Sequence, residues 1–228
     1  MKNLKRIICL LLVFSIAFGT AVIASAADTS TTDDNAIVAR MYLCHKASTD
    51  HTWIYIENLS DKPIQVGAYP AMIKKGEGVS VGTYGTTVED GPGLYYNFEA
   101  WRYRNLDPIN DKDHVFTYLT KDITAADLEK VNNMIVNSNR WSKILNCAYT
   151  ALRIWNKIPG KKVTYLYFPF LIELQIAMKS GVTTNKETGF KMITPTLNQT
   201  FKQIDLGDSV TTALSNPVPI AEPSNGDE

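Results

Sequence analysis

The sequence predicts an α+β domain, in which an antiparallel β-sheet of about five to six strands is followed by helices packed on it. Two observations support this fold class. Up to about residue 121, short stretches alternate apolar and polar residues, and turns rich in glycine, proline and asparagine separate them. From about residue 124 onward, apolar residues instead recur at helical spacing.

The expected strands are short and closely spaced. They comprise residues 37–44, His51–Asn58, 64–69, 79–84, 94–103 and 114–121. The clearest alternation is in His51–Asn58, which places Thr52, Ile54 and Ile56 on one face and His51, Trp53, Tyr55 and Glu57 on the other. Because the connections are short, an antiparallel meander is expected.

Three helices are expected in the second half. The first follows Thr124, a good N-cap residue, and ends at residues 137–139. The second covers residues 147–158 and has Asn146 as its N-cap. The third covers Pro169–Ser180, with proline in its first turn. Strands therefore precede helices along the chain.

The first 26 residues are expected to be a signal peptide. Basic residues at positions 2, 5 and 6 precede an apolar segment, and the small side chains of residues 24–26 suit cleavage after Ala26. We therefore expect a secreted or extracytoplasmic bacterial protein with no stable membrane insertion after cleavage. Residues 27–35 are expected to form a flexible leader, 36–214 a single α+β domain, and 215–228 a disordered tail.

The composition argues against a nucleic-acid ligand. The chain has 23 basic and 23 acidic residues, and the expected signal peptide contains three basic and no acidic ones. Its removal would leave a net charge of −3, whereas nucleic-acid binding requires a basic surface. An apolar content of 45% is sufficient for one sizeable core.

Cys147 is the main candidate nucleophile. It opens a helix directly after Asn146, where unpaired N–H groups and the helix dipole favour the reactive thiolate. His51 begins an apolar-aromatic strand and is the candidate base. Its rivals are His45, which borders a polar turn, and His114, which opens a later strand.

A third side chain usually orients such a base. Gln65, on a strand expected to pair with the His51 strand, is one candidate. Asn97 and Glu99 share a face of residues 94–103, and the sequence does not separate the three. Three aromatic residues are candidates for lining a substrate groove: Trp53, Tyr55 and Trp101.

Two alternatives to an enzyme remain open. Cys44 and Cys147, the cysteines left after signal cleavage, would form a disulfide in a stapled surface protein. A non-catalytic secreted binding module would instead use the aromatic strand face, with Cys147 buried. The spacing of Cys44, His45 and His51 matches no standard zinc pattern, so no metal site is expected.

The strand at residues 51–56 and the later helix Asn146-Cys147-x-x-x-Ala151-x-x-x-Trp155-Asn156 together resemble the circularly permuted papain-like hydrolases. These are related to the NlpC-type cell-wall peptidases and to lecithin–retinol acyltransferase. In permuted members the histidine strand precedes the cysteine helix, as it does here by 96 residues. The similarity covers roughly residues 38–160 and includes segments 66–69, 81–85 and 96–99.

The resemblance implies a permuted papain-like fold, with Cys147 as nucleophile and His51 as general base and then acid. It also implies that the backbone N–H of Cys147, next to the N-cap residue Asn146, contributes to an oxyanion hole. Family members often carry a polar or histidine third residue on the strand after the catalytic histidine, where this chain offers only Gln65. The expected function is a cysteine amidase, peptidase or acyl-transfer enzyme that acts on a peptide, cell-wall or acyl substrate without a cofactor.

Overall fold

The computed structural model describes residues 35–85, 88–105, 115–164, 169–180 and 184–215. The chain divides into two units, Met1–Asp33 and Asp34–Glu228, and all described residues belong to the second. The expected signal peptide, nearly all of the expected leader and tail, and His114 lie outside the described residues. Within the described ranges, no helix has the length and hydropathy that a membrane span requires.

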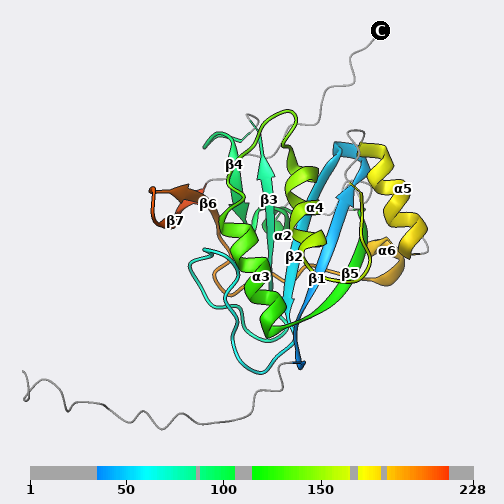
Figure 1. Cartoon of the computed structure of the whole chain (residues 1–228), viewed down its shortest axis with the longest axis horizontal. Helices are drawn as coiled ribbons and strands as arrows, with labels where there is room; N and C mark the ends of the chain where they lie inside the picture. The colour runs from blue at the N-terminus through cyan, green and yellow to red at the C-terminus, as the bar shows by residue number, and fades with distance from the viewer. Residues whose placement is uncertain (1–34, 86–87, 106–114, 165–168, 181–183, 216–228) are drawn as a thin grey trace, which may run out of the picture. The chain divides into compact units, whose positions relative to one another are not determined.

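A seven-stranded antiparallel sheet forms the centre of this unit, in the order β5-β1-β2-β3-β4-β6-β7 (Figure 1). Its strands are β1 Ile37–Lys46, β2 His51–Asn58, β3 Gly78–Tyr84, β4 Gly93–Tyr96, β5 Thr117–Thr124, β6 Thr200–Asp205 and β7 Val210–Ser215. Strands β1 to β4 form the expected meander, and β5 pairs with β1 at one edge. The α+β class is confirmed, with more strands than expected.

Among the described residues, five α-helices and one 3-10 helix accompany the sheet. They are η1 Ala47–Thr49, α2 Phe98–Asn105, α3 Ala125–Val136, α4 Cys147–Lys157, α5 Pro169–Ser180 and α6 Asn185–Thr188. The expected helices α3, α4 and α5 are all present. Thr124 caps α3, since its hydroxyl accepts the backbone N–H of Asp127 at 3.2 Å.

Two of the expected strands are wrong. Residues 64–69 form a loop whose only ladder contact is an isolated bridge between Ile64 and Ile73. Residues 94–103 break after Tyr96 because Asn97 takes a left-handed backbone with φ of 61°, and helix α2 begins at Phe98. Local sequence patterns suggested both strands. In residues 94–103 the extended backbone ends at Asn97, because asparagine tolerates the left-handed conformation.

The order of elements along the chain also differs from the expectation. Strand β5 follows helix α2, and the β6–β7 hairpin follows α6, so strands and helices do not occupy separate halves. Strand β6 completes the sheet by pairing with β4, about one hundred residues earlier in the sequence. Residue patterns within a short window carry no information on such distant pairing.

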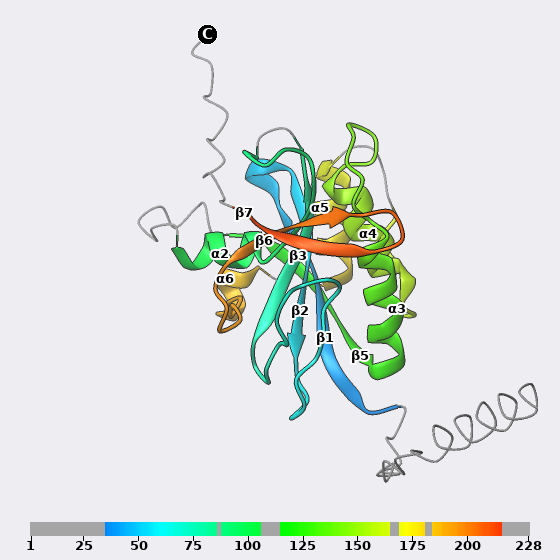
Figure 2. The same ribbon diagram turned by 90° about the vertical axis from the view of Figure 1, so that its left-hand side faces the viewer.

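The two faces of the sheet bury different side chains. On one face Ile54 and Ile56 of β2 belong to an aliphatic core with Ala151 and Ile154 of α4, and α3 and α5 contribute to it. On the other face Trp53 belongs to an aromatic cluster that residues of α2 and the region around α6 complete. Figure 2 shows α2 and α6 on one side of the sheet, and α3 and α4 on the other.

Candidate active site

Cys147 is the first residue of helix α4, as the sequence predicts. The side chain of Asn146 caps this helix by accepting the backbone N–H of Tyr149 at 3.2 Å. The backbone N–H of Cys147 is among the four that an α-helix leaves without an intrahelical partner. The Cys147 Sγ atom lies 3.8 Å from the carbonyl oxygen of Asp50, directly before His51.

His51 and Cys147 meet at the ends of their elements. Helix α4 packs on the Ile54 and Ile56 face of β2, which is opposite to the face that carries Trp53. The expectation that the His51, Trp53 and Tyr55 face packs against the Cys147 helix is therefore wrong. Because each residue opens its element, the two ends lie close together, and the His51 imidazole and the Cys147 thiol shift each other's pKa.

The pKa values of the two groups move in opposite directions. Burial acts to raise the pKa of the Cys147 thiol, but the charge and hydrogen bond of His51 and the backbone N–H groups of Thr52 and Ala148 outweigh it, so this pKa is lowered. Burial acts to lower the pKa of His51, but the charge and hydrogen bond of Cys147, with the charge of Glu99, raise it. These shifts favour a thiolate–imidazolium pair.

Glu99 is the candidate third residue that reaches His51. Its Oε1 atom lies 3.4 Å from His51 Nε2. The carboxylate is only 1% exposed and accepts the Tyr84 hydroxyl at 2.9 Å. Arg102 Nη1 lies 3.6 Å from the same oxygen, one turn later on α2. Sequence patterns singled out neither Tyr84 nor Arg102.

The other two candidate third residues lie elsewhere. Gln65 donates its side-chain amide to the carbonyl oxygens of Gly67 and Tyr69, within the loop before β3. It is not on a strand beside β2, whose partners are β1 and β3. Asn97 donates its side-chain amide to the Gln199 carbonyl at 3.1 Å. Each amide therefore stabilises a loop connection.

Aromatic rings hold the imidazole of His51 in place. The Tyr84 ring lies 4.5 Å from it between centroids, and the Trp53 ring is stacked at 5.6 Å. Gly82 leaves room for this packing, because a Cβ atom there would lie 3.3 Å from the Trp53 Cβ and 3.7 Å from His51 Nε2. The ring therefore has little freedom to rotate away from the thiol.

Of the expected groove residues, only Trp101 is partly exposed. Trp53 is fully buried, and Tyr55 is 1% exposed with its hydroxyl bonded to the backbone of Ile193. The expectation that Trp53 and Tyr55 line a substrate groove is wrong, because packing from α2 and the α6 region covers their face. The alternative of a non-catalytic binding module required this aromatic strand face to be exposed, and Trp53 and Tyr55 on it are buried.

Cys44 and His45 are buried on β1, which pairs with the strand that carries His51. Burial, with a contribution from Glu99, raises the pKa of the Cys44 thiol well above its ordinary value. Burial and the charge of His51 lower the pKa of His45 to about 4, and its Nδ1 atom lies 2.9 Å from the Thr52 hydroxyl. Both described cysteines are free thiols, which is contrary to the disulfide alternative.

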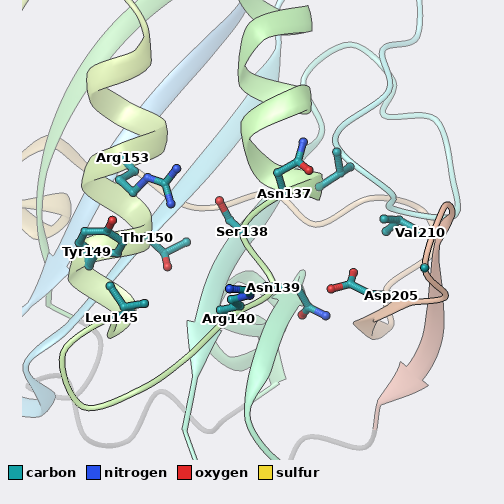
Figure 3. Close-up of a pocket in the computed structure, with 12 residues that line it drawn as sticks. Asn137, Ser138, Asn139, Arg140, Leu145, Tyr149, Thr150, Arg153, Asp205 and Val210 are labelled. Carbon is teal, nitrogen blue, oxygen red and sulfur yellow. The ribbon is translucent and has the colours of Figure 1, made fainter.

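Two cavities are lined by described residues that include neither Cys147 nor His51. One of about 490 Å³ lies beside the aromatic cluster, and its lining includes Phe116, Phe190 and Met192 together with the basic residues Arg104, Lys186 and Lys191. The other, of about 420 Å³, lies between α3, α4 and the β6–β7 hairpin (Figure 3). It includes Leu145 and Tyr149, which precede and follow Cys147 by two residues.

Comparisons of the chain with protein-family models, curated proteins and solved structures find no match. The resemblance of the His51 and Cys147 segments to permuted papain-like hydrolases therefore stays a hypothesis. The geometry around the thiol, the imidazole and the Glu99 carboxylate carries the functional inference.

Proposed function

We propose that this protein is a cysteine hydrolase of the permuted papain-like kind, in which Cys147 and His51 act as a catalytic pair. The observation that carries the proposal is the proximity of these residues: the Cys147 Sγ atom lies 3.8 Å from the carbonyl oxygen of Asp50, directly before His51, and the pKa of the thiol is lowered while that of the imidazole is raised. This combination supplies an activated nucleophile and a protonated acid at the same place.

The thiolate of Cys147 attacks the carbonyl carbon of an amide or ester, and the C–S bond forms as the carbonyl π electrons move to oxygen. Collapse of this tetrahedral intermediate expels the amine or alcohol, which takes the proton of the His51 imidazolium. A water molecule then attacks the thioester while neutral His51 accepts its proton. Release of the acid restores the thiolate and the imidazolium.

Backbone N–H groups at the start of α4 support the charged states of this cycle. The N–H groups of Thr52 and Ala148 are among the causes that lower the pKa of the Cys147 thiol, which favours the thiolate before attack. The N–H of Cys147 has no intrahelical partner and is the candidate donor to the oxyanion that forms on the substrate. Asn146 keeps this helix end in place through its capping bond.

Glu99 acts as the positioning residue for the base. Its carboxylate faces Nε2 of His51 and stabilises the imidazolium that the first half of the cycle requires. Tyr84 and Arg102 hold this carboxylate from two sides. The third position is therefore filled from helix α2, and neither Gln65 nor a strand residue fills it.

The substrate is a peptide, cell-wall or acyl compound, and the reaction needs no cofactor. Cell-wall peptide is the substrate class favoured by analogy with the family that the sequence resembles, together with the secretion signal expected at residues 1–26. The hydrolytic and acyl-transfer versions differ only in whether water or another nucleophile resolves the thioester.

A panel of activated acyl esters and peptide amides tests the proposal on the purified protein. We expect a burst of product equal to the enzyme concentration, and a covalent adduct on Cys147 in the intact mass. Cys147→Ala should abolish both signals, while the matched control Cys44→Ala should retain them because the Cys44 thiol is buried and its pKa is raised. Activity that survives Cys147→Ala would refute the mechanism.

A further inference from the structure

The cavity beside helix α4 is built from three elements that are distant in sequence. The end of α3 and its following loop form one wall, the first two turns of α4 form another, and the β6–β7 hairpin closes the third side (Figure 3). Its volume of about 420 Å³ lies within the range of small-ligand pockets. Its lining combines hydroxyl, amide and charged side chains with apolar ones such as Val136, Leu145 and Val210.

Two guanidinium groups and one carboxylate line this cavity. They belong to Arg140 after α3, Arg153 on α4 and Asp205 at the end of β6. Among the described residues neither arginine has an ion-pair partner, and Arg153 lies 5.4 Å from the Tyr149 ring in a cation–π contact. The two arginines and the one aspartate give the lining of the cavity a formal net charge of +1.

The cavity is next to the proposed nucleophile. Leu145 and Thr150 lie two residues before and three residues after Cys147, and both line it. With a rise of about 1.5 Å per residue, Thr150 is only about 4.5 Å farther along the helix axis than Cys147. A substituent a few bonds away from the attacked carbonyl can thus extend around the helix end into the cavity.

We propose that this cavity binds a carboxylate of the substrate whose carbonyl Cys147 attacks, so that the substrate is an acidic acyl compound or peptide. The inference rests on the proposed function for the identity of the attacked bond. Arginine suits the role because its planar guanidinium donates two parallel hydrogen bonds to a carboxylate. The Thr150 side chain adds a hydroxyl donor at the same wall. Asp205 weakens binding by repulsion.

Direct binding tests the cavity without relying on catalysis. Glutarate and the neutral glutaramide are titrated into Cys147→Ala protein, and amide shifts of Ser138 and Thr150 are followed by NMR. We expect glutarate alone to shift them, about tenfold weaker binding in Arg153→Ala or Arg140→Ala, and tighter binding in Asp205→Asn. Arg153→Lys should bind with intermediate affinity because it keeps the charge but not the planar fork.

Catalysis then separates this inference from the proposed function. The p-nitrophenyl monoester of glutarate is compared with its neutral methyl ester, and the ratio of kcat/KM values is measured. We expect the wild type to favour the anionic ester about tenfold, and Arg153→Ala to remove that preference. Hydrolysis by Cys147 with a ratio that is unchanged in both arginine variants overturns the inference and leaves the proposed function standing. Arginine-dependent glutarate binding without any turnover refutes the proposed function but keeps the carboxylate site.

Discussion

The Nε2 atom of His51 lies 3.4 Å from the Oε1 atom of Glu99, which is 1% exposed. His51 opens strand β2, and Glu99 lies in the first turn of helix α2, so the contact joins two elements at one end of the sheet. A buried carboxylate beside an imidazole favours the protonated ring. The same oxygen accepts the Tyr84 hydroxyl, which holds the carboxylate toward the base.

Replacing Glu99 with Gln should lower the pKa of His51. The charge of Glu99 is among the causes that raise this pKa, and glutamine keeps the shape while removing the charge. NMR titration of the His51 imidazole measures this decrease. Glu57→Gln, which removes a carboxylate that accepts from Tyr42, is the matched control. An unchanged His51 pKa in Glu99→Gln would exclude the positioning role.

Cys147 should react with iodoacetamide much faster than Cys44 in the folded protein. The pKa of the first thiol is lowered by His51, while burial raises that of the second. We expect a rate ratio on the order of one hundred at neutral pH, measured by intact mass and peptide mapping. His51→Asn should slow the alkylation of Cys147 near pH 6 and leave Cys44 protected. Equal labelling of the two thiols would contradict the assignment.

Hydrolysis should follow a bell-shaped dependence on pH. The value of kcat/KM rises as Cys147 loses its proton, at a pH below the ordinary thiol value of 9.0. It falls as the His51 imidazolium loses its proton, at a pH above the ordinary histidine value of 6.5. Because the two groups interact, the apparent pKa values of the two limbs of the pH profile belong to the Cys147–His51 pair and not to either residue alone. A rate that keeps rising to pH 10 would show that no imidazolium is required.

Removing the cap at Asn146 should destabilise the domain. Asn146→Ala loses the bond to the Tyr149 N–H, and the free energy of unfolding should fall by about 1 kcal/mol. Asn146→Ser keeps a capping oxygen and should lose only a few tenths of this amount. Urea unfolding of the wild type and both variants provides the comparison, and equal midpoints for all three would show that the cap contributes nothing.

Lys121 should make the free energy of unfolding depend on pH in the alkaline range. Its ammonium group donates to the carbonyl oxygens of Trp155 and Ile158 at the end of α4, and burial, with the charge of Lys162, lowers its pKa from 10.5 to about 8. Between these values the unfolded chain binds the proton that the folded one has released. Stability should therefore rise with pH in this window for the wild type relative to Lys121→Met. If chemical unfolding gave the wild type and Lys121→Met parallel profiles of unfolding free energy against pH, the lowered pKa of Lys121 would be contradicted.

Several features of the site could be predicted from the sequence because they depend on neighbours along the chain. The cap at Asn146, the start of α4 at Cys147 and strand β2 from His51 all follow from local signals. Capping needs one side chain beside free N–H groups, and alternation needs a few successive residues. Those signals placed the candidate thiol and base at the ends of their elements.

Only the tertiary structure decided which groups surround them. The sequence did not distinguish Gln65, Asn97 and Glu99 as candidates for the third residue. The left-handed backbone at Asn97 and the helix α2 that follows it bring Glu99, and neither of the other two, to His51. Packing from α2 and the α6 region buries Trp53. The β6–β7 hairpin, near the C-terminal end of the described residues, forms one side of the cavity that Arg140 and Arg153 line. Such contacts join residues tens of positions apart, and their free energy comes from shared burial that no short window of sequence contains.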